Sequence, residues 1–143
     1  MSTVKHALKD IPETVADLGA FRSFCAALKA AGLTESLKGK GPFTVFAPTD
    51  EAFAKLGESV LQDLLKPQRR GKLRAILNYH VLQGSLLAAE LVKSSSTRTV
   101  QGTGLTIHFK NNRMHVNNAM VLQADIACEN GVVHVLDTVV IPR

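Results

Sequence analysis

The apolar residues in the first half of the chain recur at the spacing of an α-helix. One stripe occupies positions i, i+3, i+4 and i+7, with the members Phe21, Phe24, Cys25 and Leu28. Such a stripe predicts an amphipathic helix whose apolar side faces a core. Gly32 follows the stripe and is a suitable C-terminal stop, so the helix is expected to end near residue 31.

Similar signals predict short helices at residues 12–18, 50–56, 60–65, 73–78 and 86–92. Thr49 is placed to cap the helix that begins at Asp50. We expect the Asp50 carboxylate to brace that same helix start, where it complements the helix dipole. Residues 43–46 and 79–82 are predicted to be extended.

The second half of the chain changes to a period of two. Residues 105–110 alternate between apolar and polar side chains, which is typical of a half-buried strand. Hairpin turns are predicted at residues 111–112 and, most strongly, at residues 130–131, an Asn-Gly pair. Residues 132–141 are apolar on both faces and predict a central strand covered on both sides. Helices followed by an antiparallel sheet indicate an α+β fold.

The length of 143 residues favours a single domain, spanning residues 1–143. Its core is expected at residues 11–142, and residues 1–10 form an N-terminal extension. The longest apolar runs fall far short of the ~20 residues of a membrane span, so no transmembrane segment is expected. Residues 1–9 also lack the apolar stretch of a signal peptide. Either the protein stays inside the cell, or its numbering begins after a leader was removed.

Two cysteines, Cys25 and Cys128, fit no zinc or redox spacing. One interpretation is a pair of small thiols that are buried or half-buried. The other is a disulfide that closes a long loop, which the chain-entropy model associates with about 4–5 kcal/mol of stability.

Three stretches go beyond periodicity. GPFTVFAPTDEAFAKL at residues 41–56 and NGVVHVLDTVVIP at residues 130–142 resemble the two signature boxes of the fasciclin domain family. Between them, residues 78–82 resemble the tyrosine–histidine segment of that family. The resemblance implies a wedge of two β-sheets with several short helices packed on one side. It also implies a role in adhesion, outside the cytoplasm. The compact single domain looks most like the bacterial members.

The resemblance also suggests partner-binding residues. In animal members the tyrosine–histidine segment is associated with integrin binding, and Tyr79 and His80 match it. A second associated segment reads Glu-Pro-Asp-Ile-Met in the family, and here only Asp125 and Ile126 agree with it. The alternative for Tyr79 and His80 is structural. Because their neighbours are apolar, the tyrosine is then packed and the histidine hydrogen-bonded, and together they hold helix to sheet.

The other histidines and acids do not form a recognisable catalytic or metal-binding pattern. HExxH, CxxC, GxSxG and a Walker loop are all lacking, so we expect no enzyme, cofactor or metal centre. His134 is interpreted as a satisfied core residue, and Asp137 as the anchor of a turn or a backbone amide. His108 and His115 are expected to approach each other across a hairpin, where they would bind a stray metal only weakly.

The net charge is +5, and part of it is concentrated in Lys66, Arg69, Arg70, Lys72 and Arg74. Two of these cations fall at a predicted helix start, where they oppose the helix dipole. The stretch is either a solvated face or an anion-binding patch for sulfated or carboxylated polysaccharide, or for an anionic membrane surface. Stacking aromatics are lacking there, so nucleic acid is not expected as a partner.

The sequence therefore predicts a non-enzymatic adhesion or binding module. It would act as a monomer and contact a cell-surface protein or an acidic polysaccharide. Its expected location is secreted, periplasmic or at the cell surface. The alternative is a carrier that holds a small apolar ligand, such as a lipid, between helices and sheet.

Overall fold

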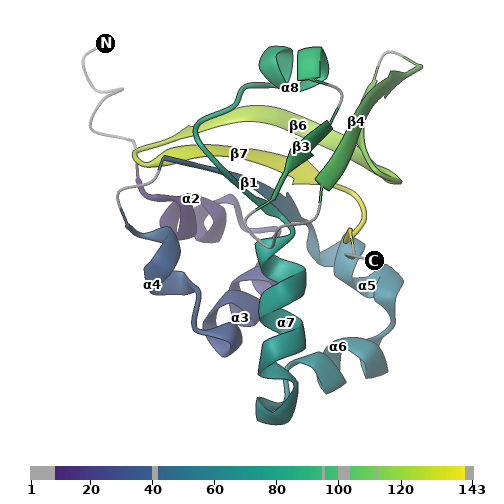
Figure 1. The fold of residues 1–143 in the computed structure, drawn as a ribbon. Coiled ribbons are helices and arrows are strands. Elements are labelled where there is room, and N and C mark those ends of the chain that lie inside the picture. Colours follow the sequence, from purple (N-terminus) through teal and green to yellow (C-terminus); the bar gives the residue numbers. More distant parts are fainter. Residues whose placement is uncertain (1–8, 40–41, 95, 100–103, 112, 141–143) are drawn as a thin grey trace.

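The structure, a computed structural model, describes residues 9–39, 42–94, 96–99, 104–111 and 113–140. Most helices pack beneath one side of a curled sheet, and α8 lies on the other side (Figure 1). The helices are α2 (Ile11–Leu18), α3 (Arg22–Ala31), α4 (Thr34–Leu37), α5 (Asp50–Leu56), α6 (Glu58–Leu64), the 3₁₀ turn η1 (Pro67–Arg69), α7 (Arg70–Asn78) and α8 (Ala88–Ser94). The strands are β1 (Phe43–Pro48), β2 (Val81–Gln83), β3 (Ser96–Arg98), β4 (Gly104–Lys110), β5 (Arg113–Val116), β6 (Ala119–Cys128) and β7 (Gly131–Leu136).

Within the described residues the strands form one hydrogen-bonded series in the order β2-β1-β7-β6-β5-β4-β3. β6 joins the two parts of the series, because its first residues pair with β5 and its later residues pair with β7. The expected α+β class is confirmed. The expectation of a purely antiparallel sheet is wrong in one place, because β1 and β7 run parallel, with Val45 opposite Val133.

The sheet separates two hydrophobic cores. The first lies between the helices and one face of β1 and β7, and includes Phe24, Val45 and Val133. The second lies inside the curl of the sheet and includes Phe46 and Leu136. Neighbouring residues of β1 thus enter different cores, and all six residues of β7 are buried. The predicted central strand is confirmed, although it ends at Leu136 and not at residue 141.

Side-chain oxygens cap the helices that surround the first core. Thr49 accepts a hydrogen bond from the backbone N–H of Ala52 at 3.1 Å, as predicted. Asp50 lies in the first turn of α5, where its charge complements the helix dipole as predicted, but the expected brace of that helix start is wrong. Its Oδ1 accepts from the backbone N–H of Ser23 at 2.8 Å, so it caps α3 and not its own helix. α3 needs this cap because Phe21, which precedes the helix, has no side-chain oxygen.

The Asn-Gly turn between β6 and β7 does more than reverse the chain. Asn130 Oδ1 accepts from the N–H of Ile11 at 3.0 Å, and its Nδ2 donates to the carbonyls of Leu37 at 2.6 Å and Gly39 at 2.8 Å. Gly131 lies so close to β1 that a Cβ there would be 1.9 Å from the carbonyl oxygen of Phe43. The turn therefore fixes α2 and α4 against the end of the sheet.

Candidate functional site

Tyr79 lies inside the molecule, in the turn between α7 and β2. Only 3% of its surface is exposed. Its hydroxyl donates to the carbonyl of Gly104 at 2.9 Å and accepts from Nδ2 of Asn117 at 2.9 Å. Both hydrogen-bonding roles of the hydroxyl are therefore filled, and the side chain links the end of α7 to the start of β4 and to the turn between β5 and β6.

His80 is completely buried next to Tyr79. Its Nδ1 lies 2.8 Å from the carbonyl of Ile76, and its Nε2 accepts from the N–H of Val140 at 3.2 Å. Because a carbonyl only accepts, the proton is on Nδ1. Burial lowers the pKa of His80 to about 4, although the bond to Ile76 acts in the opposite direction. The imidazole is thus neutral at pH 7 and ties helix to sheet, as the structural alternative proposed.

The predicted extended conformation of residues 79–82 is wrong for its first half. Tyr79 and His80 form a turn after α7, in which Tyr79 keeps a helical backbone conformation, and β2 begins only at Val81. The backbone N–H of Tyr79 remains within reach of the carbonyls of Ala75 and Ile76. α7 thus ends at Asn78, as predicted, and the turn that follows places both aromatic rings in the interior.

Asp125 and Ile126, the second predicted pair, lie on β6. Asp125 has a positive φ of 60°, and its Oδ1 accepts from the N–H of Ala88 at 2.8 Å, which holds the start of α8. Its side chain is still 45% exposed, whereas Ile126 is half-buried against the first core. Tyr79 and His80 bond to other elements, and among the described residues no hydrogen bond joins the two predicted segments.

His134 supports Asp125 from within the sheet. Its Nδ1 accepts from the N–H of Asp125 at 3.1 Å, and its Nε2 donates to the carbonyl of Leu86 at 2.9 Å. Its ring also stacks on Phe46, with 5.5 Å between the centroids. Burial lowers the pKa of His134, while Leu86 and Asp125 oppose that shift. His134 is thus the satisfied core residue that the sequence predicted. Asp137 accepts from the N–H of Met120 at 2.8 Å and likewise anchors a backbone amide as predicted.

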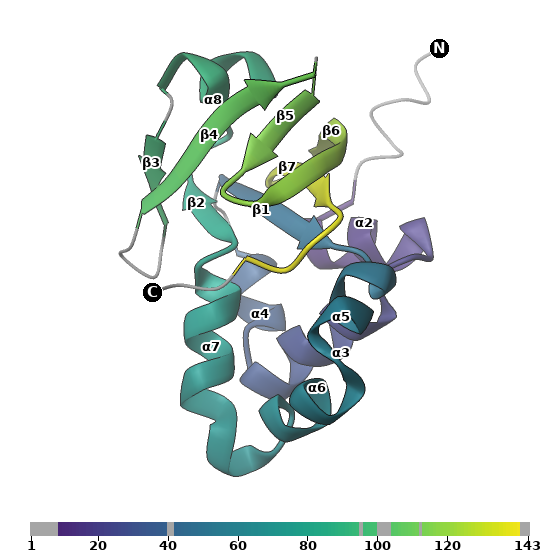
Figure 2. The same cartoon turned by 90° about the vertical axis from the view of Figure 1, so that its right-hand side faces the viewer.

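The five predicted cations form an exposed surface around the start of α7, which we call the basic helix start: Lys66, Arg69, Arg70, Lys72 and Arg74. It lies at the end of the helical layer that is furthest from the sheet (Figure 2). Asp63 forms ion pairs with Lys66 at 3.7 Å and with Arg69 at 3.2 Å. Arg70 Nε donates to the carbonyl of Ala30 at 3.3 Å and so holds the last turn of α3.

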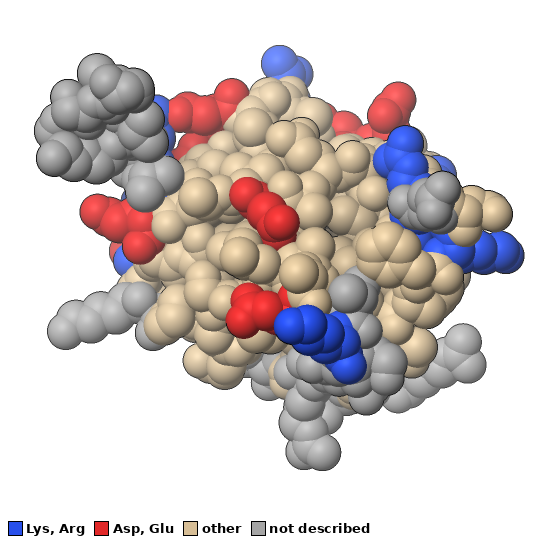
Figure 3. Space-filling model, turned by 90° about the horizontal axis from the view of Figure 1, so that it is seen from above, with Lys and Arg blue, Asp and Glu red and all other residues tan. Residues whose placement is uncertain are grey.

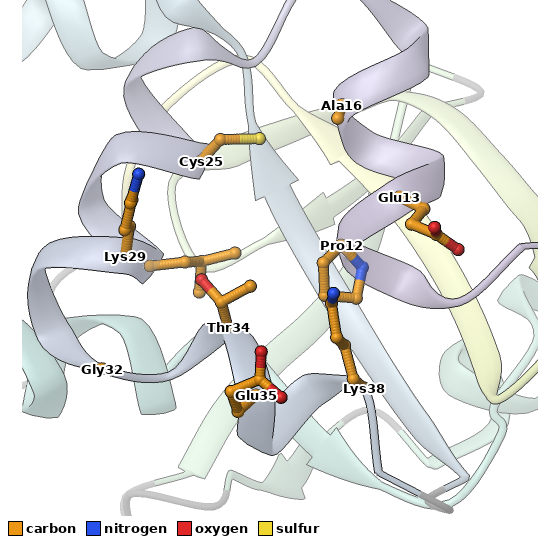
Figure 4. A pocket seen from close by; sticks show the side chains of 10 residues that line it. Pro12, Glu13, Ala16, Cys25, Lys29, Gly32, Thr34, Glu35 and Lys38 are labelled. Carbon is orange, nitrogen blue, oxygen red and sulfur yellow. The ribbon is translucent and has the colours of Figure 1, made fainter.

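A groove between α2, α3 and α4 was not predicted from the sequence. It encloses about 540 Å³ and is lined by Pro12, Glu13, Ala16, Cys25, Leu28, Lys29, Gly32, Thr34, Glu35 and Lys38. The Cys25 thiol points from α3 toward α2 (Figure 4). Ala16 and Cys25 also line a second hollow of about 440 Å³, so the two are neighbours along the same pair of helices. The groove depends on how two helices pack, which local periodicity does not specify.

Cys25 and Cys128 are both free thiols in the structure. Burial raises the pKa of each thiol, with the nearby carboxylates Asp50 and Asp10 acting in the same direction for Cys25 and Cys128 respectively. Among the described residues, no three His, Cys, Asp or Glu side chains converge to hold a metal ion. Within that same part of the chain, no helix combines the length and apolar character that crossing a bilayer requires.

Comparison with known proteins places these features in a family. The family model described as the fasciclin domain matches residues 19–142. Protein sll1483 of Synechocystis is 41% identical over 145 residues, which cover 99% of this chain and 80% of that protein. Transforming growth factor-beta-induced protein ig-h3 of Sus scrofa is 39% identical over 122 residues, which cover 85% of this chain but only 18% of that protein.

A solved structure has the same fold. It is a FAS1 domain pair from the insect cell adhesion molecule Fasciclin I, with a TM-score of 0.83 and 19% sequence identity. The likeness covers 92% of this chain and 50% of the insect chain, and it shows the shared fold. Together with the match over residues 19–142, it shows that this chain belongs to the fasciclin domain family.

Proposed function

We propose that this domain is a non-enzymatic binding module that contacts an acidic partner outside the cytoplasm through the basic helix start. The family supports a binding role, because the structurally similar insect protein is a cell adhesion molecule. The observation that carries the proposal is the position of the cations. Lys66 to Arg74 contain five cations and no acid, and all five are exposed around a helix N-terminus. Positive charge at that end of a helix opposes the helix dipole, so the charge itself does not stabilise α7.

The contacts of the basic helix start divide its cations by role. Asp63 compensates part of the charge of Lys66 and Arg69, and Arg70 has a structural bond to α3. Lys72 and Arg74 are exposed on α7 itself. Asp63 lies outside the stretch and pairs with two of its five cations, so a positive electrostatic potential remains at the surface. Such a potential attracts sulfate or carboxylate groups of a polysaccharide, or an acidic protein surface, in a salt-dependent way.

The tyrosine–histidine pair has a different part in this proposal. Tyr79 and His80 end the helix that begins with the cations, and their buried hydrogen bonds fix that helix against the sheet. They would thus present the binding surface in one orientation. Of the four residues predicted to contact a partner, Asp125 is the one whose side chain is substantially exposed. A direct contact through Asp125 stays a prediction.

The experiment is retention of the purified domain on heparin as the salt concentration rises. We expect the variant with Arg69, Arg70 and Lys72 changed to Gln to elute at clearly lower salt. The pair Lys72→Gln and Arg74→Gln, which avoids the bond to α3, should shift elution in the same direction. The matched control changes Lys93, Lys110 and Arg113 to Gln, which removes equal charge elsewhere. Equal elution of the control and the first variant would show that only net charge matters, and would contradict the proposal.

The groove between α2, α3 and α4 favours a second candidate, a carrier of a small apolar ligand. Its volume of about 540 Å³ is within the usual ~300–1,000 Å³ range of ligand pockets. It lies between helices, however, whereas the space between helices and sheet is filled by the first core. Native mass spectrometry tests this candidate. A bound apolar molecule that disappears in the Ala16→Phe variant would support it, and a bare chain with no added mass would not.

A further inference from the structure

Three donor side chains lie in one row across the outer face of the sheet. His108 on β4 is directly opposite His115 on β5, and His115 is directly opposite Met120 on β6. Directly opposite residues of antiparallel strands point to the same face. Five of the six residues next to these donors, among them Ile107 and Val121, are buried in the second core, whereas Phe109 at the end of the hairpin is 59% exposed. The two imidazoles and the thioether therefore share the solvent face.

The two imidazoles lie close together, and the ring of His115 is held by a backbone carbonyl. Their ring centroids are 5.2 Å apart and the rings are nearly parallel, at 10°. Nδ1 of His115 lies 3.1 Å from the carbonyl of Arg113. Since the carbonyl can only accept, Nδ1 holds the proton and the Nε2 lone pair is free. Metal-binding histidines are commonly fixed in this way, by a bond from the other ring nitrogen to a backbone carbonyl.

Met120 is the third donor, and its side chain has no packing role in either core. Met120 is half-buried and belongs to neither hydrophobic cluster of the described residues. Met114, in contrast, lies on the opposite face of the neighbouring strand and is only 5% exposed within the second core. The backbone of Met120 is held from both sides. Its N–H donates to the Asp137 side chain at 2.8 Å, and its carbonyl accepts from the N–H of Asp137 at 3.0 Å. The backbone at Met120 is therefore fixed, and its unbranched side chain has three rotatable bonds with which to reach a ligand.

We propose that His108, His115 and Met120 form a binding site for monovalent copper. Imidazole suits copper and zinc alike, but a thioether is a soft ligand that selects Cu(I). The local charge also favours a monovalent ion over a divalent one. Lys110 and Arg113 are paired next to the two histidines and are exposed, and basic side chains gather at the edge of the molecule where this hairpin lies (Figure 3). Neighbouring cations disfavour a divalent ion more than a monovalent one.

The spacing of the row is compatible with one shared ion. Metal–nitrogen bonds to histidine are about 2.0 Å long, so two ring nitrogens on one ion are at most ~4 Å apart. Rings whose centroids are 5.2 Å apart need side-chain rotations to bring one nitrogen of each onto the same ion. The unbranched methionine side chain then reaches over from the next strand. Two residues of the site, both histidines, belong to the set His, Cys, Asp and Glu, and the third donor is the sulfur of Met120.

The test is titration of the full-length, tag-free chain with Cu(I), without oxygen and in competition with a chromogenic Cu(I) chelator. Cys25 and Cys128 are replaced by Ala, because thiols also bind Cu(I). We expect one Cu(I) per chain. His108→Gln and His115→Gln should each weaken binding at least tenfold. Met120→Leu should weaken Cu(I) binding severalfold and leave the weaker binding of Zn(II) unchanged. Met114→Leu is the matched control and should leave both affinities unchanged.

Nuclear magnetic resonance of the ring nitrogens and methionine methyl groups gives an independent measurement. In the chain with Cys25 and Cys128 replaced by Ala, Cu(I) should shift the signals of His108, His115 and Met120 and leave those of His80 and His134 in place. The proposal is overturned if the His108→Gln, His115→Gln double variant binds Cu(I) as tightly as its parent. It is overturned equally if Met120→Leu has no effect on Cu(I).

Discussion

The backbone N–H of Val140 donates a hydrogen bond to Nε2 of His80 across 3.2 Å, and both residues are buried. The two are 60 residues apart in the sequence, so this bond closes the end of the chain onto the end of α7. Ile76 holds the other nitrogen of the same ring. The tyrosine–histidine segment is therefore a brace inside the domain, and changes there should alter stability before they alter binding.

Replacing His80 with Ala should lower the free energy of unfolding by about 3 kcal/mol. The change leaves a cavity and removes the partners of two buried backbone groups, on Ile76 and Val140. Urea denaturation measures the loss, and heparin retention below the melting temperature should stay near that of the parent. A variant that is as stable as the parent but no longer binds would reverse this interpretation.

The stability of the domain should fall as the pH drops from about 6.5 to 4. Burial lowers the pKa of His80 from 6.5 to about 4, so the unfolded chain binds a proton in this window that the folded chain does not. The contribution of His80 is complete above the unfolded pKa and is lost toward the folded pKa. A shift of that size corresponds to about 3 kcal/mol. The lowered pKa of His134 acts in the same direction.

The measurement is the free energy of unfolding from urea titrations at pH 7, 6, 5 and 4. His80→Gln removes the titrating ring and should flatten the curve over this window. His115→Gln, a change on the outer face of the sheet, is the matched control. If the His80→Gln curve keeps the slope of the parent, His80 is not the source of the pH dependence.

Gly131→Ala should prevent folding, whereas Gly71→Ala should stabilise the domain. A Cβ at Gly131 would lie 1.9 Å from the carbonyl oxygen of Phe43, which is rigid backbone, and φ there is 157°. Gly71 lies within α7 and has no atom near its Cβ position, so alanine there gains roughly 0.5–1 kcal/mol. Circular dichroism and thermal unfolding of the two variants test the pair. A folded Gly131→Ala protein would contradict the close approach of the turn to β1.

Asp50→Ala should cost about 1 kcal/mol through the loss of the cap on α3. Asn at the same position keeps a side-chain oxygen and should restore most of the loss. Glu51→Ala, which removes an exposed carboxylate from the same helix turn, is the control and should cost less. Thermal unfolding of the three variants makes the comparison. An equal loss for Asp50→Asn and Asp50→Ala would show that charge, and not the hydrogen bond to Ser23, is what matters.

The features that the sequence predicted well depend on near neighbours. The stripe of α3, the cap by Thr49 and the alternation in β4 each involve residues a few positions apart. All three are present, although the alternation holds for Leu105 and Ile107 and not for Phe109, which is 59% exposed. The hairpin that brings His108 opposite His115 is equally local. The strands and helices were therefore predictable from spacing alone, with ends displaced by a few residues.

The features that the sequence did not predict involve distant segments. Asp50 has two plausible helix starts to cap, and only the fold brings Ser23 to it, 27 residues earlier. The parallel pairing of β1 with β7 leaves no periodic signal that differs from that of an antiparallel strand. The candidate site shows the same division. The burial of Tyr79 followed from its apolar neighbours, whereas the groove beside Cys25 required the packing of two helices.

The pairing of β1 with β7 also sets the order in which the domain can assemble. Phe43 pairs with Gly131, so the centre of the sheet joins positions that are 88 residues apart. Contacts of such long range slow folding, because a large loop must close before they form. During synthesis on the ribosome, β1 and the helices around it emerge long before their central partner. Until β7 arrives, the edge of β1 that will pair with it has unpaired backbone groups, and such an edge is prone to aggregation.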